Sequence, residues 1–320
     1  MALISVVIPC YNAGRYIVST LTALEKQTFK DFNVILADDC STDDTALVIE
    51  EYAAQSPLRL LYTKNDCNSG PAVSRNNAIA LSDATYICCC DSDDWYDEDY
   101  LANMAAAAQE SRADIVLCGH RVTFENGKPP LQRPLPCEAG KLSKENALLL
   151  NVDALWCVMV KRELAQSFPL PNLRNGEDMA VIPVWMMHAK SFAAVPQPMY
   201  NYLLRQGSLS NKVTLKVVGS LEASFDNIKK NLVKEYAAQI EYIGIRNLVY
   251  GALLNLFKCG NDKDRARQIL GDFEKDFPGW KENPYMDRLP LFKRFFVKAA
   301  ANRWFWLTRL LTVVHSVLAR

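Results

Sequence analysis

Short apolar runs alternate with helical segments over the first 90 residues, and this alternation constrains the fold more than any other feature of the sequence. Between successive runs, apolar residues recur at the spacing of one face of an α-helix. Strands that are connected through helices lie parallel, so the pattern predicts a doubly wound α/β sheet. The predicted strands are residues 4–8, 34–37, 58–62 and 85–90, and the predicted helices include residues 16–24, a helix that opens at Ser41, and residues 72–81.

Polar clusters follow three of these predicted strands. The first strand leads into Pro9-Cys10-Tyr11-Asn12, the second into Asp38-Asp39, and the fourth into Asp91-Ser92-Asp93-Asp94. The carboxyl ends of parallel strands share one edge of the sheet, where ligands of such folds bind. Two carboxylates this close repel each other unless a cation lies between them, and Mg²⁺ or Mn²⁺ binds carboxylates together with substrate phosphates. Asp91-Ser92-Asp93 therefore predicts a metal site, although a solvated turn before the next helix uses the same residue types.

The cysteines and the N-terminus predict a cytoplasmic protein. The ten cysteines include no C-x-x-C pair, and residues 88–90 are three consecutive cysteines inside an apolar run. This pattern predicts neither a zinc site nor a disulfide framework, and free thiols fit a reducing compartment. The first apolar run ends at Pro9 and has no basic segment before it, which is not the pattern of a signal peptide. The net charge is zero, and we expect no nucleic-acid partner.

The sequence is expected to divide into three parts. Residues 1–210 are predicted to form the α/β domain, and residues 211–287, where the apolar spacing is helical, a helical extension. Residues 288–320 form a tail with seven Lys or Arg and no Asp or Glu, which leaves 29 basic and 36 acidic residues in the rest of the chain. Within the first part, residues 121–142 are expected to form a loop or irregular hairpin, residues 156–160, 192–195 and 199–204 strands, and residues 179–187 a helix.

The tail is predicted to associate with a membrane surface. Aromatic and aliphatic residues alternate there with Lys and Arg, which is typical of a basic amphipathic helix at a membrane interface. Residues 304–319 are too short for a spanning helix and contain Arg309. The alternative is that the tail completes the protein's own core or a dimer interface.

Five short motifs occur in order between residues 4 and 208. Together they resemble the family 2 glycosyltransferases, an inverting group with a single nucleotide-binding α/β domain. Cys40 stands where that family usually has Gly, and Ser74 where it usually has Ala; the last third of the chain is outside the resemblance. The motifs are Pro9-Cys10-Tyr11-Asn12, Ala37-Asp38-Asp39-Cys40-Ser41-Thr42-Asp43, Asn68-Ser69-Gly70 with Val73-Ser74-Arg75-Asn76, Asp91-Ser92-Asp93-Asp94, and Glu177-Asp178.

The resemblance implies a glycosyltransferase A-type fold and assigns a role to each motif. Glu177 and Asp178 could instead be acids that stabilise a helix N-terminus, and Arg205 with Ser208, which resembles the family's Arg-x-x-Ser element, could be a surface hairpin. The implied roles are uracil or ribose contact for Asp39, diphosphate contact for Arg75 and Arg205, donor binding for Pro9, Tyr11, Asn12, Asp91 and Ser92, metal ligation for Asp93, and catalysis for Asp178 as general base with Glu177 beside it.

The resemblance therefore implies an inverting, metal-dependent transferase. We expect it to move a hexose or N-acetylhexosamine from a UDP-sugar to a cell-surface glycan or lipid-linked acceptor, with Mn²⁺ or Mg²⁺ as cofactor. Lipopolysaccharide or other polysaccharide biosynthesis at the cytoplasmic face of the inner membrane is the expected setting. The alternatives are a non-catalytic nucleotide-sugar-binding assembly subunit and a nucleotidyltransferase. The sequence lacks the Gly-rich basic loop that binds a triphosphate, which disfavours the nucleotidyltransferase.

Overall fold

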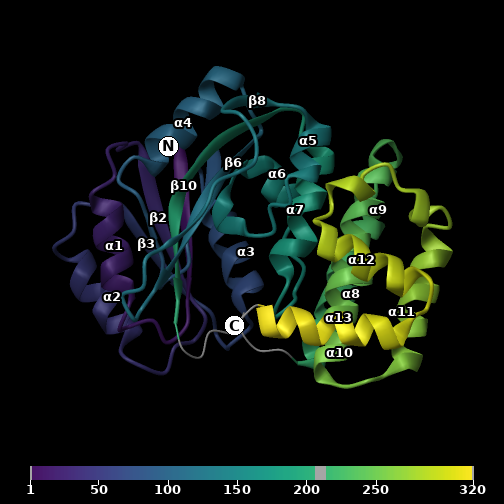
Figure 1. Cartoon of the computed structure of the whole chain (residues 1–320). Helices are drawn as coiled ribbons and strands as arrows, with labels where there is room; N and C mark the ends of the chain where they lie inside the picture. The colour runs from purple at the N-terminus through teal and green to yellow at the C-terminus, as the bar shows by residue number, and fades with distance from the viewer. Residues whose placement is uncertain (1, 206–213, 319–320) are drawn as a thin grey trace. The chain divides into compact units, whose positions relative to one another are not determined.

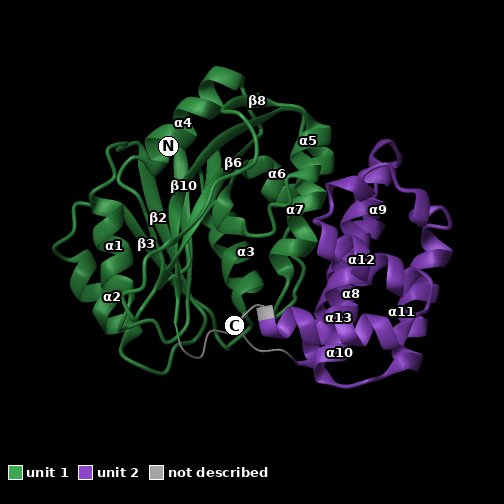
Figure 2. Ribbon diagram, viewed as in Figure 1, with its two compact units in different colours: residues 1–208 green, residues 209–320 purple. Residues whose placement is uncertain are grey.

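The computed structural model describes residues 2–205 and 214–318, which form two compact units (Figures 1 and 2). The first unit, residues 1–208, contains a β-sheet with helices on both of its faces, and the second, residues 209–320, is helical. The expected boundary at residue 210 lies outside the described residues. The expected basic tail is not a separate unit, because its helices belong to the second unit.

The first four strands form the parallel half of the sheet. They were expected within two residues of their observed positions, and each is connected to the next through a helix, as the alternation predicts. Figure 1 shows α1 and α2 on one side of the sheet and α3 on the other. The elements are β1 (Ile4–Cys10), α1 (Ile17–Glu25), β2 (Phe32–Asp38), α2 (Thr45–Ala53), β3 (Leu60–Lys64), α3 (Pro71–Leu81) and β4 (Tyr86–Cys89), with β2 parallel to β1 and β3, and β1 parallel to β4.

The second half of the sheet is mixed, so the prediction of a parallel sheet holds for the first four strands and for the neighbours β6 (Ile115–Phe124) and β10 (Phe192–Leu204), but not for the other strands paired with them. Strand β9 (Val158–Lys161) runs antiparallel to both β4 and β6. The chain reverses its direction in the connection between β6 and β7 (Leu131–Arg133), because β7, β8 (Gly140–Leu142) and β9 all run opposite to β6. Strand β10 is one bulged strand where two strands were expected, with irregularities on both sides of Pro198.

The remaining elements of the first unit complete the sheet and its covering layers. The strand order is β3-β2-β1-β4-β9-β6-β10-β5, with β7 beside β6 and β8 beside β10. Because both faces are covered by helices, the central strands are apolar throughout and not alternating. These elements are β5 (Trp95–Tyr96), α4 (Tyr100–Ser111), β7 (Leu131–Arg133), β8 (Gly140–Leu142), α5 (Lys144–Leu149), α6 (Arg162–Ser167) and α7 (Glu177–His188).

The second unit packs its helices around aromatic side chains. Gly244 is required there, since a Cβ atom at this position would lie 2.5 Å from the rings of both Phe225 and Phe273. Within the described residues, no helix is both long enough and apolar enough to cross a membrane. The helices are α8 (Leu215–Lys230), α9 (Ala237–Gly244), a π-helical segment (Ile245–Ala252), α10 (Leu253–Cys259), α11 (Lys263–Asp276), α12 (Leu291–Ala301) and α13 (Phe305–Leu318).

Candidate active site

A buried arginine joins two of the predicted motifs. Arg75 lies on α3 and is only 6% exposed. Its guanidinium donates to the Asp91 Oδ1 atom after β4 and to the Glu177 Oε1 atom at the start of α7, both at 2.7 Å. Burial alone lowers the pKa of Arg75, but the charges of Asp91 and Glu177 outweigh it and raise the pKa above its ordinary value. Three elements far apart in sequence thus meet through one cation.

Asp178 lies next to this network and has a raised pKa. Burial, followed by the negative charge of Glu177, raises the pKa of Asp178 to about 7. The Met179 amide donates to its Oδ1 atom at 2.7 Å, which opposes the rise. Glu177 and Asp178 are the first two residues of α7, so the helix-terminus interpretation also holds. A carboxylate with a pKa near the working pH can accept a proton during a reaction.

Asp93 faces the second arginine of the site. The Arg205 Nε atom lies 2.6 Å from Asp93 Oδ2, and the guanidinium stacks 4.7 Å from the centre of the Tyr16 ring. Burial raises the pKa of Asp93, Arg205 opposes the rise, and the nearby charge of Asp91 adds to it. The ion pair places Arg205 beside the predicted metal ligand, which a simple surface hairpin does not require. Ser208, predicted together with Arg205, lies outside the described residues.

The carboxylates of Asp91 and Asp93 are the groups at this edge that suit Mn²⁺ or Mg²⁺. Both ions prefer oxygen ligands and commonly bind one or two carboxylates together with substrate phosphates. Among residues 2–205 and 214–318, no three His, Cys, Asp or Glu side chains are grouped to hold a metal by themselves. The two carboxylates therefore fit an ion whose remaining ligands come from a bound diphosphate and water.

The comparison with known proteins decides the family. Residues 5–167, just over half of the chain, match the model of Glycosyl transferase family 2. The chain belongs to this family. Glycosyltransferase GlyG of Streptococcus pneumoniae serotype 4 is 27% identical over 275 residues, which cover 75% of this chain and 89% of GlyG. The protein is thus a glycosyltransferase.

Solved structures share the fold of this glycosyltransferase. Residues 1–349 of TarS from Staphylococcus aureus, in complex with UDP, align with a TM-score of 0.74 at 20% identity, covering 99% of this chain and 91% of that one. The same TarS fragment has also been solved with UDP-GlcNAc. Mannosyltransferase PcManGT from Pyrobaculum calidifontis, in complex with GDP-Man and Mn²⁺, aligns with a TM-score of 0.61 at 16% identity, covering 95% of this chain and 87% of that one. These likenesses establish the glycosyltransferase A-type fold.

The first motif of the glycosyltransferase is hydrogen-bonded to the second. Asn12 adopts a left-handed φ of 51°, its amide donates to Ser41 Oγ at 2.9 Å, and its Oδ1 atom accepts from the Thr42 amide at 2.9 Å. Cys40 has a φ of 61°, so the turn keeps the conformation that glycine favours despite the substitution. Tyr11 projects from this loop and is half exposed. The donor-binding roles of these residues stay predictions.

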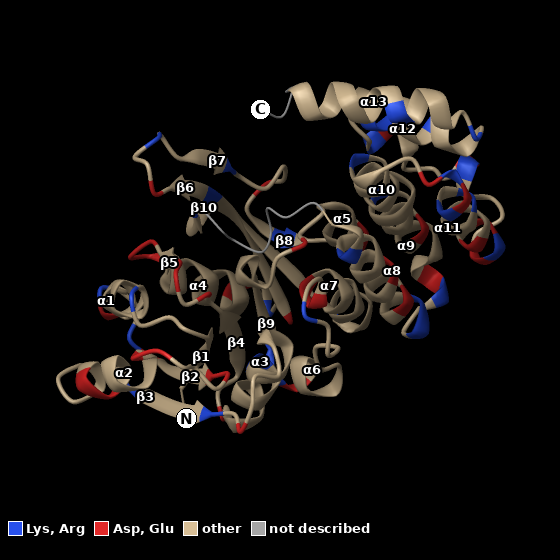
Figure 3. Ribbon diagram, turned by 90° about the horizontal axis from the view of Figure 1, so that it is seen from below, with Lys and Arg blue, Asp and Glu red and all other residues tan. Residues whose placement is uncertain are grey.

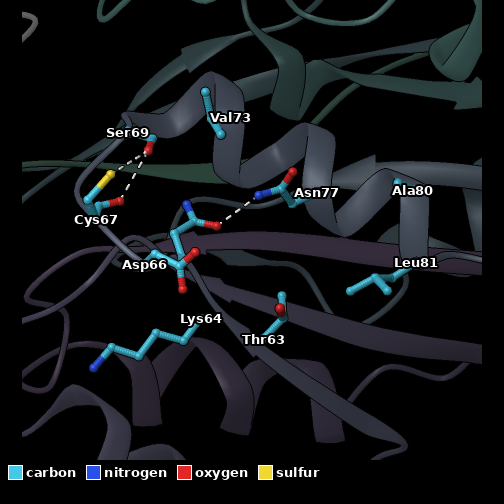
Figure 4. A pocket seen from close by; sticks show the side chains of 10 residues that line it. Thr63, Lys64, Asp66, Cys67, Ser69, Val73, Asn77, Ala80 and Leu81 are labelled. Carbon is cyan, nitrogen blue, oxygen red and sulfur yellow. Dashed lines mark hydrogen bonds between the residues drawn. The ribbon is translucent and has the colours of Figure 1, made fainter.

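Asp39 already makes three hydrogen bonds within the protein. Its Oδ1 atom accepts from Asn65 Nδ2 and from the Ser69 amide, both at 2.8 Å, and its Oδ2 atom accepts from the Gly70 amide at 2.7 Å. The carboxylate therefore holds the loop between β3 and α3. Its contact with uracil or ribose stays a prediction. That loop borders a pocket of about 490 Å³ on the α3 side (Figure 4), whose lining includes neither Asp91 nor Asp178.

Asp94 belongs to the framework of the site. It is buried, and its carboxylate accepts from the Tyr200 hydroxyl at 2.6 Å and the Leu203 amide at 2.7 Å. The Tyr200 oxygen also accepts from the Asp91 amide at 3.1 Å, which fixes the start of the acidic motif. Sequence reasoning missed Tyr200, although its place in a predicted closing strand next to the motif was available as a signal. Ser92 contributes its carbonyl oxygen, which accepts from Thr20 Oγ1 at 3.1 Å.

Proposed function

We propose that this glycosyltransferase inverts the anomeric centre of a UDP-sugar, with Asp178 as the general base. The supporting observation is the position of Asp178, whose pKa of about 7 suits proton uptake, beside the pair that Arg75 makes with Glu177. The acceptor hydroxyl gives its proton to Asp178, and its oxygen bonds to the anomeric carbon of the donor. The bond from that carbon to the diphosphate oxygen breaks, and UDP leaves with the electron pair.

The donor is proposed to be a UDP-hexose or UDP-N-acetylhexosamine. TarS, which shares the fold, has been solved with UDP and with UDP-GlcNAc. Asp91 and Asp93 are the residues that would hold Mn²⁺ or Mg²⁺, and a bound ion would supply positive charge to offset the negative charge that develops on the leaving diphosphate. We expect Arg205 to leave its ion pair with Asp93 and to bind the donor diphosphate, because guanidinium groups bind both carboxylates and phosphates. Arg75 keeps Asp91 and Glu177 in position throughout.

The acceptor is proposed to be a cell-surface glycan or a lipid-linked glycan at the cytoplasmic face of the inner membrane. The supporting observation lies on α13, which exposes an apolar stripe to water. Thr308 and Thr312 are buried, whereas Trp306 is 68% and Val317 67% exposed. Leu310, Val313 and Val314 are exposed on the same stripe, at helical spacing. Water-facing apolar stripes of this kind mark interaction surfaces.

The charges around α13 favour an anionic lipid surface. Neither α12 nor α13 contains an acidic residue (Figure 3), and Lys298 and Arg309 are exposed. Not all of the basic residues are available, since Arg294 pairs with Asp287, and Arg303 pairs with Glu274 at 2.7 Å. The chain also breaks between α12 and α13, so two short helices replace the single amphipathic helix expected from the sequence. Trp306 is suited to the headgroup level of a bilayer.

The membrane part of the proposal can be tested by sedimentation with vesicles of phosphatidylglycerol and phosphatidylethanolamine. Leu310→Glu should weaken binding on the order of tenfold, because it places a charge in the apolar stripe. Leu47→Glu is a matched control, since Leu47 is similarly exposed on α2 of the first unit. Binding should also fall with added salt. Equal vesicle binding by both variants would contradict the membrane proposal. Dimerisation that only Leu310→Glu abolishes would identify a second copy of the chain, and not lipid, as the partner of this stripe.

The catalytic part of the proposal is tested by UDP release and by the product's anomeric configuration. Asp178→Asn should lower kcat by at least about a hundredfold with little change in UDP-sugar affinity, because the amide keeps the shape but cannot accept the proton. A donor screen with Mn²⁺, followed by nuclear magnetic resonance of the product, identifies the sugar and the stereochemistry. Retention of configuration, or loss of donor affinity with unchanged kcat, would remove Asp178 from the role of base.

A further inference from the structure

Trp156 lies beside the acidic motif at the carboxyl edge of the sheet. Strand β9 runs antiparallel to β4, with Met159 opposite Cys88. The turn that precedes β9 therefore runs alongside the residues that follow β4, which begin the acidic motif. Trp156 also stacks on Tyr200, whose hydroxyl oxygen accepts the hydrogen bond from the Asp91 amide. A single side chain thus separates the indole from the backbone of Asp91.

The indole belongs to an aromatic surface that is only partly covered. Its ring centre lies 4.5 Å from that of Tyr200 and 5.8 Å from that of Tyr202, and both interplanar angles are 10°. The neighbours Leu155 and Cys157 are buried, but Trp156 itself is half-buried, as is Tyr202. A tryptophan held rigidly between buried neighbours, and still open to water, offers apolar area at little cost in conformational entropy.

A neutral histidine borders this surface. His120 meets the edge of the indole at 4.7 Å, and burial, with a smaller effect from Arg133, lowers its pKa to about 4, so the ring is neutral near pH 7. The Trp156 indole N–H makes no hydrogen bond to any residue within 2–205 or 214–318. The N–H is not one of the buried donors that lack a partner in these residues, so it is open to solvent. It can therefore donate to a ligand hydroxyl.

The strand order places this surface on the side of the acidic motif away from the nucleotide motifs. The first two motifs end β1 and β2, whereas the turn that carries Trp156 leads into β9, which lies on the other side of β4 from β1. An inverting transfer brings the acceptor in on the face opposite the leaving nucleotide. Asp153, three residues before Trp156, is near enough to Asp178 for its charge to help raise the pKa of that group. The surface therefore lies on the acceptor's side of the site.

We propose that Trp156 and Tyr202 form the acceptor subsite and bind a pyranose ring of the acceptor glycan. The apolar C–H face of the sugar packs on the aromatic surface, and the Trp156 N–H donates to a sugar hydroxyl. This contact holds another hydroxyl of the same or the adjoining residue toward Asp178. The inference rests on the proposed function, because it assigns the acceptor to the side of the site where Asp178 acts as base.

The subsite is tested with Trp156→Ala and the conservative Trp156→Phe. The probes are the methyl β-glycosides of glucose, galactose and N-acetylglucosamine, with UDP-sugar as donor and ribitol 5-phosphate as an open-chain comparison. Trp156→Ala should raise the glycoside KM on the order of tenfold, while Trp156→Phe keeps most of the affinity. The donor KM and the slow release of UDP to water should stay unchanged in both variants. Thermal unfolding checks that Trp156→Ala folds.

Saturation-transfer nuclear magnetic resonance with the same glycosides separates this inference from the proposed function, because it measures binding without turnover. The protein could bind the glycosides but turn over no UDP-sugar. If Trp156→Ala then removes the glycoside signals, the result supports the subsite and rejects the proposed donor chemistry. Turnover with a glycoside KM that Trp156→Ala leaves unchanged overturns the subsite. Preference for ribitol 5-phosphate in both variants also overturns it, because an open chain has no ring face to stack.

Discussion

Replacing Asp178 by asparagine is expected to stabilise the fold at alkaline pH even though it removes catalysis. The pKa of Asp178 is raised from an ordinary 3.8 to about 7. A raised carboxyl pKa means that the native state holds its proton more tightly than the unfolded state does. Well below pH 3.8, both states are protonated and the side chain costs nothing. As the pH rises toward the native pKa, the unfolded state ionises first, and stability is lost.

The size of this effect follows from the difference between the two pKa values. The two pKa values differ by roughly three, and one pKa unit corresponds to about 1.4 kcal/mol. Ionisation of Asp178 therefore costs the native state about 4 kcal/mol above pH 7. Asparagine carries no charge at any pH, and its side-chain oxygen can still accept from the Met179 amide. Asp178→Asn should therefore unfold at a higher urea concentration than the parent protein at about pH 8.5, and at nearly the same concentration at about pH 4.

Asp114→Asn provides a control of opposite sign. Asp114 is also partly buried, but its hydrogen bond with Lys161 and those from the Lys190 and Ser191 amides outweigh burial and lower its pKa. Its contribution to stability is present above the unfolded pKa and is lost as the pH falls. Asp114→Asn should therefore lower stability at alkaline pH, where Asp178→Asn raises it. If Asp178→Asn is no more stable than the parent at about pH 8.5, the side chain is not desolvated and the argument for a base fails.

Three further outcomes are expected. Glu177→Gln removes a negative charge beside Asp178, so it should move the acidic limb of the kcat/KM profile to lower pH; an unmoved limb would exclude that coupling. Arg75→Met leaves the buried Glu177 and the partly buried Asp91 without their cation and should lower the free energy of urea unfolding by about 3–5 kcal/mol, whereas a loss below about 1 kcal/mol would show that they are solvated. Asp93→Ala should abolish the Mn²⁺ dependence of UDP binding in calorimetry while the circular dichroism stays native; retained dependence would place the metal elsewhere.

The parallel half of the sheet and the place of the site could be predicted from the sequence. The strands near β1 to β4 follow from local spacing, and their ends bring the acidic motif to one edge of the sheet. The antiparallel direction of β9 could not be predicted, because it depends on the reversal of the chain between β6 and β7 and not on the strand's own residues. Strand β6 was also missed, since its second half is only partly buried and shows weak apolar spacing.

The partners of the charged residues could not be predicted either. The pairing of Arg75 with Glu177 joins positions 102 residues apart, and nothing in the local pattern of either motif encodes it. The same holds for Asp39. Its carboxylate was expected to contact a ligand, and the sequence did not indicate that it also accepts hydrogen bonds from the loop before α3. Sequence motifs identify which residue types gather at the site, but the tertiary packing determines which of their atoms are left for a ligand.

The acidic character of the site carries a cost that substrate binding is suited to relieve. Arg75 pairs with Asp91 and Glu177, and Arg205 pairs with Asp93, so two cations offset part of a larger group of carboxylates. Asp94 and Asp178 have raised pKa values, in both cases first because of burial and then because of neighbouring acids. Close carboxylates destabilise one another when they ionise. A fold that keeps such a group at the edge of its sheet gives up stability there, and the gain is a base that is ready to accept a proton near neutral pH.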